Sequence, residues 1–211
     1  MTTVTTDGRT VRAREQRESR RAEILQGALQ VFARNGYHQT RISDIIEAAG
    51  VARGTFYLYF ESKSAIFLEL LTEMLTQLND AIVGVDTSPS APPVEELLWS
   101  TVKRIMRTVH ENRLLTTIIV REAVGLDDEV DQRLADFYGN LLDYVRAALE
   151  EGKRMGIVRD VDTEVASLCV LGTIKQFMEE LVRSAEDATW DVDRMAYNVL
   201  DFNLRGCLRL S

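Results

Sequence analysis

The stretch Thr40–Lys63, which reads TRISDIIEAAGVARGTFYLYFESK, decides the fold of this chain. Its isoleucines and alanines recur at helical spacing and give the beginning of the stretch a single apolar face. Gly50 follows, and glycine readily adopts the left-handed conformation that turns a chain after a helix. A second helix near residues 52–58 is too short to be stable alone and must pack on its neighbours. Two short helices joined by a glycine turn predict a helix-turn-helix, whose second helix normally lies in the major groove of DNA.

Apolar residues at helical spacing continue on both sides of this stretch. Upstream, they predict a helix over residues 19–34 that ends at an Asn-Gly pair. The β-branched residues of 114–124 also permit a strand, but no partner strand is predicted, so a buried helix is favoured. The sequence therefore predicts an all-α protein. Downstream, the expected helices are 63–84, 93–112, 114–124, 127–155, 163–184 and 191–208.

These patterns divide the chain into three regions. Residues 1–18 are polar, rich in Thr and Arg, and predicted to form a flexible N-terminal arm. Residues 19–63 hold the helix-turn-helix, and residues 64–211 hold the remaining helices. The last two helices, 163–184 and 191–208, carry apolar residues on more than one face, which predicts that they also form an interface.

Charge is distributed unevenly along the chain. The net charge of −8 alone disfavours nucleic acid as a partner. Residues 1–63 nevertheless hold ten Lys/Arg against seven Asp/Glu, whereas the remainder holds 15 against 26. The positive charge of residues 1–63 suggests that only this region contacts the phosphates of a nucleic acid. The alternative is that the charge varies along the chain without functional reason. The arginine-bearing arm has two interpretations, a DNA contact and a solvated tail, and we favour the tail.

Several classes of protein are excluded by what the chain lacks. No apolar run approaches the roughly 20 residues of a membrane span, and the first residues lack the apolar core of a secretory signal, so a cytoplasmic location is expected. Cys169 and Cys207 are far apart and are expected to be buried free thiols. Only His38 and His110 are present, and there is no GxGxxG or GKS/GKT phosphate loop. We therefore expect no enzyme, no metal and no cofactor.

The string GVARGTFYLYFESK over residues 50–63 carries a family resemblance. Together with the preceding helix that ends in Asn-Gly, and with Phe67 beyond it, this string resembles TetR-type bacterial repressors. The detailed match covers residues 19–70, and the rest resembles the family only in helical content and length. The resemblance implies an N-terminal three-helix helix-turn-helix DNA-binding domain and a C-terminal helical ligand-binding and dimerisation domain.

Residue chemistry and the resemblance together assign the DNA-facing side chains. The hydroxyl of Thr40 and the ammonium of Lys63 are expected at phosphates, and Arg53 is expected to read a base edge. Gly54 permits close approach of the backbone to DNA. Core packing is the alternative for the two tyrosines. The expected DNA-contacting residues are Thr40, Arg41, Arg53, Gly54, Thr55, Tyr57, Tyr59 and Lys63. The expected inward residues are Ile42, Ile45, Ile46, Val51, Phe56 and Phe60.

The resemblance also implies a homodimer on a palindromic operator, released by a small hydrophobic effector. Effector and DNA would each weaken the binding of the other. A fatty acyl thioester, a steroid or a lipophilic drug fits the apolar pocket candidates; for each candidate, core packing is the alternative. Expected pocket residues are Met74, Trp99, Met106, Ile118, Phe137, Tyr138, Tyr144, Leu168, Gly172, Thr173, Gln176 and Phe177. Expected dimer-interface residues are Ile174, Met178, Leu181, Val199, Phe202 and Cys207.

The sequence therefore predicts a DNA-binding transcriptional regulator, most simply a repressor. The alternative is an all-α protein-interaction module whose helix-turn-helix is only structural. Exposed Arg53, Thr55, Tyr57 and Lys63 side chains would argue against that alternative, because a purely structural motif has no need to present them to solvent.

Overall fold

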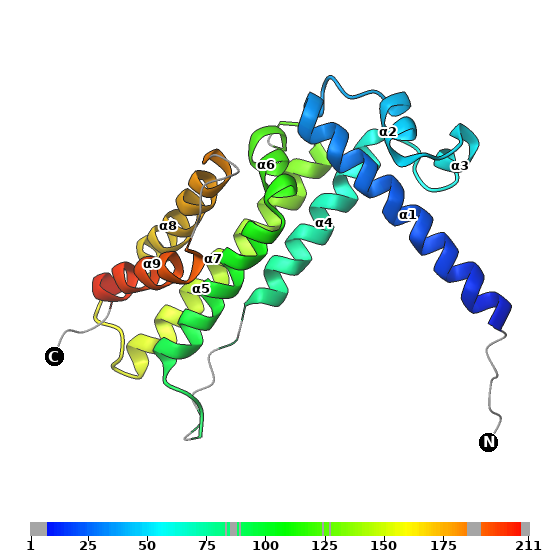
Figure 1. Cartoon of the computed structure of the whole chain (residues 1–211). Helices are drawn as coiled ribbons and strands as arrows, with labels where there is room; N and C mark the ends of the chain where they lie inside the picture. The colour runs from blue at the N-terminus through cyan, green and yellow to red at the C-terminus, as the bar shows by residue number, and fades with distance from the viewer. Residues whose placement is uncertain are drawn as a thin grey trace, which may run out of the picture. The chain divides into compact units, whose positions relative to one another are not determined.

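The computed structural model describes residues 8–82, 84, 88, 90–123, 125–126, 128–184 and 191–207, and gives only the backbone of residues 8, 9, 181, 206 and 207. Within these residues every regular element is an α-helix, which confirms the predicted fold class (Figure 1). The helices are α1 (Gly8–Asn35), α2 (Ile42–Ala49), α3 (Arg53–Tyr57), α4 (Lys63–Ala81), α5 (Val94–Glu111), α6 (Arg113–Glu122), α7 (Asp128–Arg154), α8 (Thr163–Arg183) and α9 (Val192–Cys207).

The chain divides into two compact units, Met1–Thr72 and Glu73–Ser211. The division falls inside α4 and not at its first residue, where the sequence analysis placed it. The physical reason is that α4 supplies apolar side chains to the first unit: Ile66, Phe67 and Leu70 are buried there. The first unit therefore needs about two turns of α4 to complete its core.

The core of the first unit is built from α1, α2, α3 and the start of α4. Ile24 and Phe32 of α1, Ile45 of α2 and Phe56 of α3 are all fully buried. The ring of Phe32 lies 6.2 Å from that of Phe67. Ile45, Phe56 and Phe60 are thus core residues, as the sequence predicted, while the other predicted inward residues are half-buried.

Helices α1 and α2 approach each other closely at Gly27. A Cβ atom at this position would lie 2.9 Å from the backbone nitrogen of Ala49 and 3.0 Å from its Cα. Such distances are shorter than van der Waals contact, so a side chain at residue 27 would force the two helices apart. Glycine at this position therefore permits the short distance between α1 and α2.

α1 begins at Gly8, so residues 8–18, predicted to belong to a flexible arm, are helical; residues 1–7 lie outside the described range. Ion pairs one turn apart support this helix: Arg14 to Glu18 at 2.7 Å and Arg20 to Glu23 at 2.5 Å. The hydrogen bond from Arg14 to Glu18 raises the pKa of the arginine. Spacing of apolar residues could not predict this portion of α1, because it buries none.

One cluster of the core of the second unit lies between α5 and α9. Val102 and Met106 of α5 pack against Ala196 and Val199 of α9, with Ile174 of α8 at the edge. The prediction of a buried helix over 114–124 is confirmed by α6, whose Leu115 and Ile118 are buried.

α8 begins at a capped end. The carboxylate of Asp162 accepts the backbone N–H groups of Glu164 and Val165 at 3.0 and 3.1 Å, which satisfies two of the free donors at the start of the helix. None of the helices in the described part of the chain is both long and apolar enough to cross a membrane.

Candidate nucleic-acid interface

The turn between α2 and α3 has the geometry that its glycine predicted. Gly50 adopts a left-handed conformation with φ of 62°, and its N–H donates to the carbonyl of Glu47 at 3.1 Å. A residue with a Cβ atom is strained in this conformation. The turn ends α2 after eight residues, and α3 follows from Arg53.

α3 is held by one side and exposes the other. Phe56 is fully buried and anchors the helix, whereas Tyr57 is 46% exposed and Leu58 is 75% exposed. The guanidinium carbon of exposed Arg53 lies 5.9 Å from the centroid of the Tyr57 ring, a cation–π contact. No other atom lies within 4 Å of a Cβ built on Gly54, so the backbone here is open to a partner.

We call the outward residues Arg53, Gly54, Thr55, Tyr57 and Leu58 the α3 surface. It combines a cation, a hydroxyl, a phenol and a bare stretch of backbone, which are the groups that contact phosphates and base edges. Leu58 was missed in the sequence analysis. Its exposure follows from its neighbours: because Phe56 and Phe60 both point inward, Tyr57 and Leu58 are left to face solvent, while Tyr59 is half-buried.

Thr40 does not belong to this outward set. It is only 3% exposed, its hydroxyl donates to the carbonyl of Gly36 at 2.7 Å, and its N–H donates to the carbonyl of Tyr37 at 3.2 Å. The expectation that Thr40 holds a phosphate is therefore contradicted, because both of its donors are satisfied inside the protein. Arg41 is exposed next to it and forms the N-cap of α2.

Lys63 is also directed inward. Its ammonium donates to the carbonyls of Tyr37 at 2.8 Å, His38 at 3.2 Å and Thr40 at 3.1 Å, and it lies 4.4 Å from the centroid of the Tyr37 ring. A lysine has three N–H donors, so all are used. Lys63 therefore ties the loop after α1 to the start of α4, which contradicts its predicted place on the outward face.

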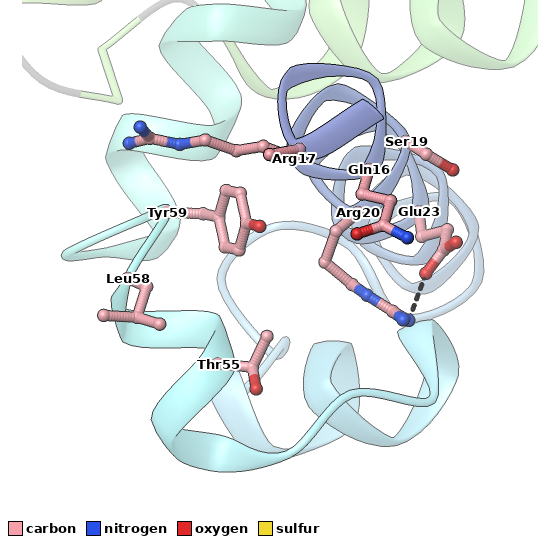
Figure 2. Close-up of a pocket in the computed structure, with 9 residues that line it drawn as sticks. Gln16, Arg17, Ser19, Arg20, Glu23, Thr55, Leu58 and Tyr59 are labelled. Carbon is pink, nitrogen blue, oxygen red and sulfur yellow. Dashed lines mark hydrogen bonds and ion pairs between the residues drawn. The ribbon is translucent and has the colours of Figure 1, made fainter. Parts of the chain in front are cut away.

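A groove lies beside the α3 surface within the first unit. Figure 2 shows Thr55, Leu58 and Tyr59 on one side of it and residues of α1 on the other. Tyr59 is half-buried in this groove. Its partial burial does not decide between the two predicted alternatives, DNA contact and core packing. The lining residues are Ala13, Gln16, Arg17, Ser19, Arg20, Glu23, Thr55, Leu58 and Tyr59.

Two family models match the chain. The model described as bacterial regulatory proteins, tetR family, matches residues 24–70, and the model described as tetracyclin repressor-like, C-terminal domain, matches residues 91–179. The chain belongs to the TetR family of bacterial transcriptional regulators. Its first match begins at the first buried residue of α1 and ends in α4, so it covers the core of the first unit.

Similar proteins agree with this family. The fatty acid metabolism regulator protein of Bacillus subtilis is 27% identical over 195 residues, which cover 91% of this chain and 97% of that protein. The regulator FadR from Bacillus subtilis, in complex with stearoyl-CoA, has 25% identity and a TM-score of 0.68, covering 88% and 98% of the two chains. PfmR from Thermus thermophilus shares the fold, with 24% identity, a TM-score of 0.72 and coverage of 88% and 99%. The chain is accordingly a DNA-binding transcriptional regulator with a helix-turn-helix.

The residues predicted to line an effector pocket do not form one buried set. Met74, Met106 and Ile118 are buried, and Met106 belongs to the core between α5 and α9. Trp99, Phe137 and Thr173 are half-buried, and the Thr173 hydroxyl donates to the carbonyl of Cys169 in its own helix. The remaining candidates are exposed in the single chain: Tyr138, Tyr144, Leu168, Gly172, Gln176 and Phe177.

The exposed candidates on α8 share one face. The candidates Leu168, Gly172 and Gln176 recur at helical spacing, and Leu168 is 54% exposed. Val165, which was not a pocket candidate, extends the same face. The prediction of the three candidates as pocket residues is therefore wrong for the single chain. The reason is that other residues of α8, such as Ser167, Ile174 and Val182, form the side that packs on the protein, which leaves this stripe outside. Cys169, which was expected to be buried, is also exposed.

The predicted dimer-interface residues also divide. Val199 is 2% exposed and Ile174 packs on the same core, so both contribute to the interior and not to a surface. Phe202 is 71% exposed and Met178 is half-buried, and both remain candidates. The side chains of Leu181 and Cys207 lie outside the described part of the structure.

Proposed function

We propose that this TetR-family protein is a repressor that binds a palindromic operator as a homodimer, with the α3 surface in the major groove. The observation that carries the proposal is the outward set of α3: Arg53, Gly54 and Tyr57 are exposed on a helix whose opposite side is anchored by Phe56. Arg41, at the N-cap of α2, supplies a further cation. Thr40 and Lys63 take no direct part and instead shape the loop that precedes α2.

The alternative of a purely structural helix-turn-helix is disfavoured by these exposed side chains. Burying Phe56 and Phe60 requires neither an arginine nor a phenol on the solvent side of α3. The inward position of Lys63 removes one of the four residues that the sequence analysis cited against this alternative. Thr55 is half-buried, so the alternative is disfavoured chiefly by Arg53 and Tyr57, which are both exposed and in cation–π contact.

The homodimer is supported by the unpartnered face of α8 and by Phe202 of α9. An apolar stripe that stays exposed in a single chain favours burial against another molecule, and a second copy presents the same stripe. On a palindromic operator, two α3 helices that enter successive major grooves lie about 34–36 Å apart, one turn of DNA, and the proposed dimer would have to match this spacing.

For the effector, we propose a lipophilic molecule such as a fatty acyl thioester. Support comes from the similar regulator whose structure contains stearoyl-CoA, and from the apolar character of the pocket candidates on α5 and α6. An effector that binds better to the protein free of DNA lowers its affinity for DNA by linkage. Because regulators of this kind act on chromosomal DNA, a cytoplasmic location accompanies the proposal.

The test is direct binding to DNA. A labelled duplex is selected from a random-sequence pool with the wild-type protein, and its binding is followed by fluorescence anisotropy. Arg53→Ala and Tyr57→Ala should each weaken binding by at least tenfold, whereas Arg133→Ala, at an exposed position of α7, should leave it unchanged. Stearoyl-CoA should release the duplex and the shorter acetyl-CoA should not.

Three results would contradict elements of the proposal. If no duplex is selected, or if Arg53→Ala and Tyr57→Ala bind as well as the wild type, the assignment of the α3 surface is wrong. If only polar metabolites release the duplex, the effector class is wrong. If sedimentation shows a monomer at micromolar concentration with and without DNA, the homodimer is wrong.

A further inference from the structure

The N-terminal half of α1 has few contacts within its own unit. The contacts that it does make involve Arg21, near its end, which pairs with Glu69 of α4 and lies 5.2 Å from the centroid of the Phe60 ring. Every residue from 10 to 23 is exposed, and burial begins only at Ile24. Figure 1 shows this half as the free end of α1, beyond the portion that packs on α2. We call residues 10–23 the α1 extension. A helix that is polar on all sides gains nothing from packing, so its structure must be supported by local ion pairs or by a partner.

The charges of the α1 extension are sorted by face. At 100° per residue, Arg12, Gln16, Arg17 and Arg20 fall on one side of the helix. Three of these four are cations, and the side contains no large apolar residue. Glu23 lies on the same side and pairs with Arg20, so the side keeps a net positive charge. The opposite side holds Glu15, Glu18 and Arg14, and Arg14 is engaged by Glu18 at 2.7 Å. One side is therefore basic, and the other side is neutralised by its own carboxylates.

The basic side faces the groove that borders the α3 surface. Gln16, Arg17 and Arg20 line this groove together with Thr55 and Tyr59 (Figure 2). Thr55 also belongs to the α3 surface, so the two surfaces are continuous. Among the described residues, Arg12 and Arg17 have no ion pair, whereas Arg20 shares its guanidinium with Glu23 at 2.5 Å. Of these two free cations, Arg17 lines the groove next to the proposed DNA-reading helix. Arg12 lies on the same side of α1, more than one turn closer to the N-terminus.

We propose that the α1 extension is a second DNA-contacting element that binds backbone phosphates beside the major groove occupied by α3. The inference rests on the proposed function, since it takes DNA as the partner of α3. The extension is about 21 Å long at about 1.5 Å per residue, which matches about six phosphates along one strand. Guanidinium groups bind phosphates with paired N–H donors. A basic face that lacks apolar anchors fits a phosphate backbone better than a protein partner.

We expect the α1 extension to increase the affinity of the protein for DNA without discriminating between base sequences. Phosphate contacts position a protein on the duplex and release counterions, so they increase the salt dependence of binding. Removing one contact lowers the slope of log K against log salt concentration by about 0.9 for B-DNA. Removing Arg53 of the α3 surface should instead relax the choice of sequence.

The test uses the full-length protein and the duplex selected with the wild type. Arg12→Gln and Arg17→Gln are compared with Arg14→Gln, which removes the same charge from the opposite side of the same helix. Affinity is measured from 50 to 300 mM KCl, together with a hydroxyl-radical footprint. We expect a slope lower by about one for Arg12→Gln and for Arg17→Gln, loss of protected sugars next to the α3 groove, and no change for Arg14→Gln. Circular dichroism should show unaltered melting for Arg12→Gln and Arg17→Gln, because both positions are exposed and unpaired, and at most a small loss of helicity for Arg14→Gln, which also loses its ion pair with Glu18.

The outcomes separate this inference from the proposed function. If the wild type selects no duplex, the proposed function fails. If it selects one but Arg12→Gln and Arg17→Gln keep the wild-type slope and footprint, the α1 extension does not bind DNA. An equal loss of slope in Arg14→Gln would also overturn the inference, since the effect would then come from total charge and not from the face beside the groove.

Discussion

Gly27 provides the sharpest test of how the DNA-binding unit is packed. In Gly27→Ala the new Cβ meets the backbone nitrogen, Cα and Cβ of Ala49 at 2.9–3.0 Å. Ordinary carbon contacts lie at about 3.5–4.0 Å, so α1 and α2 must separate by roughly half an ångström. Overpacking of this kind costs about 1–3 kcal/mol, while alanine in a helix interior gains about 1 kcal/mol over glycine. The net result is a loss of about 0–2 kcal/mol in the free energy of unfolding of the first unit.

A matched control isolates the clash from helix propensity. Gly139→Ala, in the middle of α7, has no atom within 4 Å of the new Cβ, so it should gain about 1 kcal/mol with no opposing term. The two variants should therefore differ by about 1–3 kcal/mol, which corresponds to roughly 2–10 °C in melting temperature for a chain of this size. Only the first unit should be affected by Gly27→Ala.

The assay must distinguish the two units. Trp99 and Trp190 both lie in residues 73–211, so tryptophan fluorescence reports the second unit and should not change in Gly27→Ala. Hydrogen exchange measured by mass spectrometry should show faster exchange of α2 in Gly27→Ala and unchanged exchange of α5. If α2 is protected as well as in the wild type, or if both variants gain stability equally, the close approach of α1 and α2 is refuted.

Four further substitutions test the site and the interface. Gly54→Ala should fold as stably as the wild type or gain about 1 kcal/mol by urea unfolding, yet lose at least tenfold in DNA affinity by anisotropy; unchanged affinity would refute the close approach of the backbone to DNA. Lys63→Met should lower the free energy of unfolding by about 1–2 kcal/mol, measured by urea unfolding, because three backbone carbonyls lose their hydrogen-bond donor. If the variant is as stable as the wild type and only binds DNA more weakly, Lys63 is a phosphate contact after all. Leu168→Asp and Phe202→Asp should shift sedimentation from dimer to monomer with unchanged helicity, since both side chains are exposed in the single chain; a dimer that persists would place the interface elsewhere.

The sequence by itself determined most of the fold and the position of the helix-turn-helix. Apolar residues at helical spacing located the helices from residue 19 onward, and Gly50 located the turn. These features are local: a helix face and a glycine with positive φ depend on residues within a few positions of each other. For the same reason the anchors Phe56 and Phe60 were predicted correctly, and Arg53 and Tyr57 were correctly expected to be exposed.

Only the tertiary structure decided which polar residues stay free to contact a partner. Lys63 looks like a phosphate ligand in the sequence, but the fold brings the carbonyl of Tyr37, 26 residues away, within 2.8 Å of its ammonium. Thr40 is buried in the same loop, and the need for glycine at residue 27 comes from the backbone of Ala49. The orientation of α8 and the helical start of α1 were likewise hidden, because the first depends on packing and the second on ion pairs. In each case a long-range neighbour or a local charge pair, which apolar periodicity does not record, determines what the side chain can do.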